Sequence, residues 1–343
     1  MEHFGRYRID GVLGDGELGR VHRAFDEQHG RPVALKILLK AGDEQPRLLA
    51  EARDGAVLEH PDVVQVYEVG EVGGVGFIAM ELIDGRPLRA AIRDSSIPLQ
   101  TRVEWLLTVA RALAAGHARG LVHRGVRPEN IRVRPDGSVK LLEWNLARRP
   151  IQPGLGPGGQ FEATAPGSSV DTPLFLAPEQ IRNQPVDARA DQFAWGVVAY
   201  ELLAGVHPWT AARDPIAMVA AILVRPARPL RDLVPDVPDS LARAIDRSLL
   251  KDPGDRFPGM AELLASLAAP AAPRSRLLGM MTSQVVSSQV VAPGERTAST
   301  SVHSGPPALP GESPEIAPRS PWPWIAAIVV AAAILGAALA AAQ

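Results

Sequence analysis

Three glycines near the start of the chain have a spacing that suits phosphate binding. They are Gly14, Gly16 and Gly19, and with Val21 they form the pattern G-x-G-x-x-G-x-V between two predicted strands. Because glycine has no Cβ, a hairpin of this kind can close over phosphate groups while Val21 covers a base. The second strand stands where a dinucleotide-binding fold would have a helix. The pattern therefore predicts a nucleotide site, but it needs support from elsewhere in the chain.

A lysine and a glutamate downstream supply part of that support. Lys36 ends the run Val-Ala-Leu-Lys on a predicted strand, and Glu51 lies on the helix predicted to follow. A lysine that is held by a carboxylate can contact the α- and β-phosphates of a nucleotide. Taken singly, each residue is equally well explained as a surface charge, so the prediction rests on the pair.

The composition excludes several classes of function. The chain has 343 residues, no cysteine and a net charge of −2. The absence of cysteine excludes disulfides, thiolate nucleophiles and cysteine-ligated metal centres. There is no run of basic residues and only 5% of the residues are aromatic, so we expect no nucleic-acid partner.

The first 83 residues predict a small β-rich lobe with one helix. Apolar residues at helical spacing predict the helix over residues 45–58. Short β-branched runs separated by glycine turns predict a five-stranded antiparallel sheet. These runs cover residues 7–13, 21–25, 33–38, 63–69 and 75–82.

The pattern becomes helical from about residue 84 to residue 268, which predicts a larger α-helical lobe. A Gly/Pro-rich loop is predicted between residues 148 and 170. The clearest helical stretches cover residues 102–118, 188–203, 215–223 and 240–249.

Residues 269–321 are rich in Pro, Ser, Thr, Gly and Ala, and they contain few large apolar side chains. Such a composition cannot bury enough apolar surface to offset chain entropy, so we predict a disordered linker.

Residues 322–343 are predicted to form a carboxyl-terminal transmembrane helix. The 18 uncharged residues 325–342 would span ~27 Å as a helix, close to the thickness of a hydrocarbon core. Trp322 and Trp324 suit a membrane interface, and Arg319 suits its cytoplasmic side. An alanine-rich tail that frays in water is the alternative. Because the first residues lack an apolar stretch, we expect no export signal, and so a single-pass protein of the cytoplasmic membrane with its folded part in the cytoplasm.

The larger predicted lobe carries a series of short motifs. Together with the glycine pattern and Lys36, they resemble in order and spacing the bacterial, eukaryotic-like (Hanks-type) serine/threonine protein kinases. The resemblance covers residues 6–267 and implies an α+β, bilobal protein-kinase fold. The motifs are His123-Arg124-Gly125-Val126-Arg127-Pro128-Glu129-Asn130, Glu143-Trp144-Asn145, Ala177-Pro178-Glu179, Asp191 and Arg256.

The resemblance implies roles for these positions, with ATP and Mg²⁺ as cofactors. Asn130 and Glu143 stand where the family holds metal ions, and Asp191 matches the aspartate that braces the catalytic loop. Arg256 matches the arginine that pairs with Glu179, and Arg124 could bind a phosphate on the activation loop. The positions that would surround the adenine and phosphates are Gly14, Gly16, Gly19, Val21, Ala34, Lys36, Glu51, Met80, Glu81, Ile83 and Arg132.

The chain departs from the family pattern where the chemistry takes place. Gly125 replaces the aspartate that accepts the substrate hydroxyl's proton, a contribution worth about 10²- to 10⁴-fold in rate. Arg127 replaces a lysine, and its planar head cannot occupy the same point. Glu143 replaces the metal-binding aspartate and displaces its oxygens by roughly 1 Å, a large change for the strict shell of Mg²⁺.

Two further positions place substrate and nucleotide binding in question. Arg132 stands where the family has a leucine-like floor beneath adenine, so it either turns to solvent or stacks on the base or an aromatic ring. Thr172 matches the threonine of the family's G-T-P segment, but Asp171 replaces the glycine before it.

A compensating pair is also predicted between the lobes. Trp144 replaces the family's phenylalanine, and Gly55 stands where a large apolar residue is usual. We hypothesise that the indole fills the space left by Gly55, with Val66 and His123 completing an apolar stack.

Three functions remain open at this point. The first is a pseudokinase that scaffolds or regulates a signalling partner, such as a true kinase. The second is a weak ATP-dependent serine/threonine kinase, which metal-dependent phosphate transfer would establish. The third is a nucleotide-sensing switch without transfer, which nucleotide binding without metal would support. The sequence does not name the partner, and neither the transmembrane segment nor the lobes define an oligomeric state.

Overall fold

The computed structural model describes residues 2–16, 19–38, 45–144, 174–210 and 215–268, which all belong to one compact unit. The predicted linker, the predicted transmembrane helix and Thr172 lie outside these residues. Within them, no helix combines the length and apolar character needed to cross a membrane.

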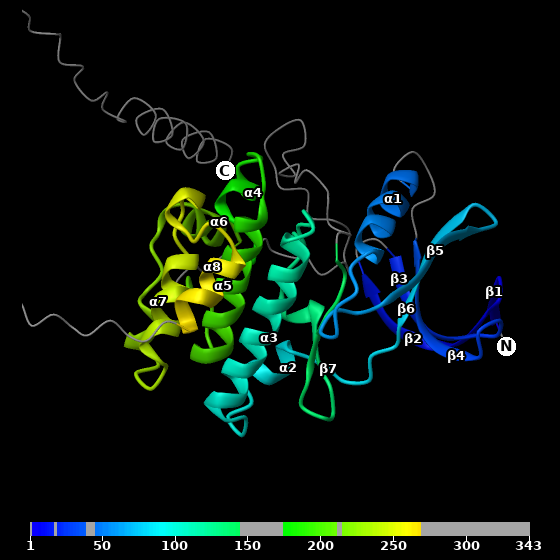
Figure 1. Cartoon of the computed structure of the whole chain (residues 1–343), viewed down its shortest axis with the longest axis horizontal. Helices are drawn as coiled ribbons and strands as arrows, with labels where there is room; N and C mark the ends of the chain where they lie inside the picture. The colour runs from blue at the N-terminus through cyan, green and yellow to red at the C-terminus, as the bar shows by residue number, and fades with distance from the viewer. Residues whose placement is uncertain (1, 17–18, 39–44, 145–173, 211–214, 269–343) are drawn as a thin grey trace, which may run out of the picture. The chain divides into compact units, whose positions relative to one another are not determined.

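A six-stranded antiparallel sheet forms the amino-terminal lobe (Figure 1). The five predicted strands are all present, with ends that move by a few residues, and β1 adds an edge strand beside β2. The strand order is β1-β2-β3-β4-β6-β5. The bounds are β1 Glu2–Phe4, β2 Tyr7–Gly16, β3 Gly19–Asp26, β4 Arg31–Leu38, β5 Val66–Val72 and β6 Val75–Glu81.

Helix α1 (Gln45–Ala56) packs on this sheet and confirms the single predicted helix of the lobe. Its buried face follows the helical spacing of the apolar residues. Leu48 and Leu49 form one cluster with Leu38 of β4, and Ala52 joins a second cluster with Ile78 of β6. The sheet and helix together bring the strand-end lysine and the helix glutamate into the same lobe.

A second sheet has three short strands, and the catalytic-loop motif ends directly before its strand β8. Strand β8 (Ile131–Val133) pairs with β7 (Arg86–Pro87) on one side and β9 (Val139–Leu141) on the other. An isolated bridge between Val63 and Leu141 links this sheet to the chain that leads into β5.

Helices form the carboxyl-terminal lobe, and those predicted from periodicity are present with similar bounds. Helix α5 is buried on every side, and the indole of its Trp195 donates a hydrogen bond to the Leu106 carbonyl of α3 at 3.0 Å. Figure 1 shows α3 and α5 side by side at the centre of this lobe. The bounds are α2 Arg89–Ile92, α3 Leu99–His117, α4 Pro178–Ile181, α5 Ala188–Ala204, α6 Pro215–Val224, α7 Asp239–Ser248 and α8 Met260–Ala268, with 3₁₀ turns η1 Pro128–Asn130, η2 Leu230–Asp232 and η3 Pro253–Asp255.

Candidate functional site

The apolar residues predicted to surround adenine gather in one cluster. Ala34 of β4 and Met80 of β6 are buried there, and Val21, Ile83 and Leu142 pack against them. The sequence placed these residues on separate strands, and pairing of β3, β4 and β6 brings them together. The cluster offers the flat apolar environment that a nucleotide base needs.

The glycine pattern forms the turn of the β2–β3 hairpin. Gly16 lies opposite Gly19, and Gly14 opposite Val21. A Cβ on Gly19 would overlap the carbonyl oxygen of Ile37, so glycine is required there by the close approach of β4. Around Gly14 there is open space, which suits a backbone that closes over a ligand rather than over protein.

Lys36 does not pair with Glu51, so that prediction is wrong. Its Nζ lies 2.7 Å from Oε1 of Glu143, and the lysine is 2% exposed. Glu51 instead accepts a hydrogen bond at 3.0 Å from Nε of Arg47, four residues earlier on the same helix. Its other oxygen, Oε2, is buried with no hydrogen-bond partner among the described residues. The lysine is therefore held by the predicted metal-binding residue.

Glu143 is held in an unusual backbone conformation. Its φ is +57°, in the left-handed region that non-glycine residues seldom adopt. Burial alone would raise the pKa of its carboxyl group. The charges of Lys36 and Arg127, with the hydrogen bond from Lys36, outweigh burial and hold that pKa below its ordinary value. Glu143 is accordingly ionised and is stabilised by the positive charges beside it.

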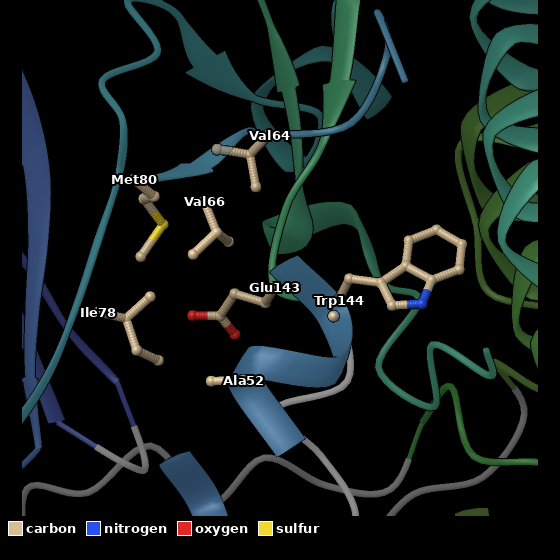
Figure 2. A pocket seen from close by; sticks show the side chains of 8 residues that line it. Ala52, Val64, Val66, Ile78, Met80, Glu143 and Trp144 are labelled. Atoms are coloured by element: carbon tan, nitrogen blue, oxygen red, sulfur yellow. The ribbon is translucent and has the colours of Figure 1, made fainter. Parts of the chain in front are cut away.

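The indole of Trp144 does not fill the space beside Gly55, so the predicted compensation is wrong. It packs instead on Gly116 of α3, where a Cβ would overlap the indole ring, and its ring centroid lies 5.0 Å from that of His123. A cavity of about 20 Å³ remains, with Gly55, Val66 and Glu143 in its wall. Figure 2 shows the Glu143 carboxylate turned toward this cavity and the indole turned away from it.

The catalytic loop has no carboxylate at the position of the base. Gly125 donates its backbone N–H to Nδ1 of His123 at 3.1 Å, and its carbonyl accepts from Nδ2 of Asn130 at 2.8 Å. Nε2 of His123 lies 2.8 Å from the Leu142 carbonyl. Burial lowers the pKa of His123, so the ring is neutral, accepts at Nδ1 and donates at Nε2.

Two buried contacts that the motifs predicted are present, and the first of them braces this loop. The carboxylate of Asp191 accepts the backbone N–H groups of His123 at 2.7 Å and Arg124 at 2.6 Å. Arg124 has a φ of +63°, so these bonds help to hold a backbone conformation that costs energy. Arg256 donates two hydrogen bonds to Glu179, at 2.7 and 2.9 Å, in a fully buried fork-to-fork pair.

Comparison with known proteins decides the family. A model described as "Protein kinase domain" matches residues 7–266. The chain belongs to the protein kinase family.

Its relatives are bacterial serine/threonine kinases of the Hanks type. It is 33% identical over 263 residues to the serine/threonine-protein kinase PknA of Mycobacterium tuberculosis, covering 74% of this chain and 58% of PknA. It is 30% identical over 348 residues to PknB of Mycolicibacterium smegmatis, covering 96% of this chain and 53% of PknB. The chain therefore spans little more than half the length of these relatives.

A solved kinase domain has the same fold. The crystal structure of the Mycobacterium tuberculosis PknI kinase domain aligns with a TM-score of 0.59 and 26% sequence identity. The alignment covers 78% of this chain and 97% of the PknI domain. The bilobal fold that the motifs implied is thus confirmed.

Arg132 of this kinase domain turns toward the segment that joins the lobes. Its Nη1 lies 3.5 Å from the Gly85 carbonyl oxygen, at the protein surface. Of the two predicted orientations, this is the one toward solvent. Arg132 therefore does not fill the floor of the adenine cluster with its charge.

Besides the pair of Lys36 with Glu143, three other charged contacts near the site were not predicted. Lys140 contacts Glu81, the last residue of β6, at 2.6 Å, and His117 contacts Asp191 at 2.8 Å. The third is the pair of Arg47 with Glu51. Only this one has a sequence signal, because residues four apart on a helix face each other. The other two join segments far apart in the chain.

The metal position of the family, which generally binds ATP with Mg²⁺, has altered contacts in this chain. One oxygen of Glu143 is bound to Lys36, and Asn130 uses its amide nitrogen on Gly125, which leaves its amide oxygen. Among the described residues no three His, Asp or Glu side chains gather closely enough to hold a metal ion. In nucleotide sites Mg²⁺ is usually bound by one or two carboxylates together with waters and substrate phosphates, so a metal here would compete with Lys36 for the Glu143 carboxylate.

Proposed function

We propose that this kinase domain is a pseudokinase, catalytically impaired and acting as a scaffold or regulator in signalling. The observation that carries the proposal is Gly125. It presents only a backbone N–H and carbonyl, and both are already bonded to His123 and Asn130. No general base faces a substrate hydroxyl at that position, so about 10²- to 10⁴-fold in rate is missing.

The pair of Lys36 with Glu143 supports the same proposal. In the family the lysine serves the phosphates and the aspartate serves the metal, whereas here the two side chains bind each other at 2.7 Å. Both would have to separate before a metal-bound nucleotide could take its usual place. The loss of the base and the loss of the metal ligand thus act on the same reaction.

The proposal extends to the membrane and to a protein partner. Residues 322–343 would anchor the chain to the cytoplasmic membrane in a single pass, with the kinase domain in the cytoplasm. The braced catalytic loop would then serve as a fixed surface for a signalling protein, such as a true kinase or its substrate. Replacing Val329 and Leu335 by arginine should release the chain from alkali-washed membranes, and continued retention would remove the anchor from the proposal.

A transfer assay tests the loss of catalysis. The full chain is incubated with ATP labelled at the γ-phosphate, a general protein substrate, and Mg²⁺ or Mn²⁺. We expect incorporation no higher than that of the Lys36→Met variant. The double reversal Gly125→Asp with Glu143→Asp should raise it above that background. Metal-dependent transfer by the unaltered chain, abolished by Lys36→Met, would contradict the proposal.

The second candidate is a weak serine/threonine kinase, and one observation favours it. Asp191 holds the backbone of the catalytic loop through two short hydrogen bonds, so the loop is still positioned as for chemistry. Phosphoryl transfer depends more on positioning and charge than on a base. The same assay distinguishes the two candidates.

A further inference from the structure

The charges at the phosphate end of the nucleotide site are unusual. Lys36 and Arg127 are positive and Glu143 is negative, which gives a net charge of about +1 if each group has its ordinary ionisation. Arg127 stands close enough for its charge to act on the Glu143 carboxylate. In the family pattern two basic residues face two carboxylates, because the family has an aspartate at the position of Gly125. The protein therefore already supplies positive charge that the family draws from metal ions.

The Glu143 carboxylate has one function that the contacts define, which is to hold Lys36. Its Oε1 lies 2.7 Å from Nζ, and Lys36 is almost fully buried. A lysine ammonium has three donors, so it can keep this bond and still donate to a phosphate oxygen. A metal ion would instead compete with the lysine for the Glu143 carboxylate, because Mg²⁺ in nucleotide sites is usually bound through one or two carboxylates with waters and substrate phosphates.

Glu143 also competes with any phosphate that approaches Lys36, because both are anions and both accept from the same ammonium. In a metal-dependent site the equivalent carboxylate attracts the nucleotide through the metal. In this site the same carboxylate should repel it. The sign of the effect of Glu143 on nucleotide affinity thus distinguishes the two kinds of site.

We propose that this site binds a nucleoside triphosphate or diphosphate as the free anion, without a divalent metal, through Lys36, Arg127 and the glycine hairpin. This inference rests on the proposed function, since a site of this kind binds nucleotide without transferring phosphate. The apolar cluster around Ala34 and Met80 would take the base. Arg127 would take the charge that metal ions balance in the family.

Calorimetric titration of the full chain with ATP and with ADP tests the inference, in EDTA and again with excess Mg²⁺. We expect binding in EDTA that is at least as tight as binding with Mg²⁺. Lys36→Met and Arg127→Ala should each weaken it about tenfold or more, the scale of one charge-assisted hydrogen bond. Glu143→Gln should tighten it several-fold. Glu129→Gln, which removes an exposed carboxylate from the same loop, should leave it within twofold.

Each alternative result overturns the inference in a recognisable way. Binding that requires Mg²⁺ and is lost in Glu143→Gln would mean that the carboxylate holds a metal. No binding of either nucleotide in either buffer would also overturn it, while leaving the scaffold proposal intact. If the unaltered chain transfers phosphate, both proposals fail. Thermal unfolding of each variant shows whether it is folded, and Arg127→Lys provides a milder second test of the guanidinium.

Discussion

The two lobes of this kinase domain differ in how their buried charges are paired. In the carboxyl-terminal lobe, Arg256 binds both oxygens of Glu179, as the motifs predicted. Lys36 of the amino-terminal lobe binds Glu143, beyond that lobe, in place of Glu51, which has one oxygen buried without a partner among the described residues. Arg256 thus has the partner that the family motifs predict. Lys36, which would contact phosphate, has a different one. A kinase fold can therefore persist after its chemistry has been altered.

The largest expected effect tests the buried pair of Arg256 with Glu179. Arg256→Ala removes one side of a buried ion pair and leaves the Glu179 carboxylate without its counter-charge. The free energy of unfolding should fall by about 3 to 5 kcal/mol, measured by urea denaturation. Arg243→Ala, which removes an exposed guanidinium 2.7 Å from Asp239, is the matched control and should cost about 0.5 kcal/mol or less. Equal losses of unfolding free energy in the two variants would contradict a stabilising role for the buried pair of Arg256 with Glu179.

A buried histidine of the carboxyl-terminal lobe should make the stability of the kinase domain depend on pH. Burial lowers the pKa of His207 to about 4, with a hydrogen bond to the Leu174 carbonyl partly opposing it. The unfolded imidazole, with a pKa of about 6.5, binds a proton first, so stability falls as the pH falls through that window.

The part of the loss between pH 6.5 and 4 that comes from His207 should approach roughly 3 kcal/mol, and His207→Gln should remove that part while the part from buried His123 remains. Unfolding midpoints across this pH range provide the measurement. His3→Gln, at an exposed position, is the control and should leave the slope unchanged. An unaltered slope in His207→Gln would assign the dependence to other groups.

The contact of Trp144 with Gly116 packs the residue after Glu143 against helix α3 of the carboxyl-terminal lobe. Gly116→Ala places a Cβ where the indole lies, and overpacking of this kind costs about 1 to 3 kcal/mol. In a Trp144→Phe background the smaller ring should relieve part of that loss. A double-mutant cycle on unfolding free energies measures the coupling. Additive effects would mean that the indole does not depend on Gly116.

The smallest expected effect distinguishes the two possible partners of Lys36. Glu51→Gln should change the free energy of unfolding by about 1 kcal/mol or less, because Glu51 bonds only the half-exposed Arg47. If Lys36 were its partner, the same change would leave a buried ammonium unpaired and cost about 3 to 5 kcal/mol. Denaturation of this single variant thus decides which glutamate holds the lysine.

The family motifs predicted more than the local periodicity did. Helical spacing located α1, α3, α5, α6 and α7, because apolar residues at that spacing must share one buried face. The pairing of Arg256 with Glu179 and the bracing by Asp191 came from the order of the motifs alone. Both are confirmed, since Arg256 binds Glu179 and the Asp191 carboxylate accepts two backbone N–H groups of the catalytic loop.

The errors arose where two candidates competed for one position. Gly55 and Gly116 both offer room for an indole, and nothing local to Trp144 indicates which it fills. The structure leaves a cavity beside Gly55 and places the ring on Gly116. Side-chain direction between segments far apart in the chain depends on the packing of the lobes, which no spacing along the sequence encodes.

The sequence predicted the kinase fold, the lost carboxylate at Gly125 and four of the apolar residues that form the adenine cluster. Only the tertiary structure decided that Lys36 is held by Glu143. Both glutamates have the same charge and reach, and both are plausible partners in a linear motif. The choice depends on which carboxylate lies within hydrogen-bond distance once α1, the sheet and the strand before Glu143 have packed, because ion-pair energies fall steeply with distance and exposure.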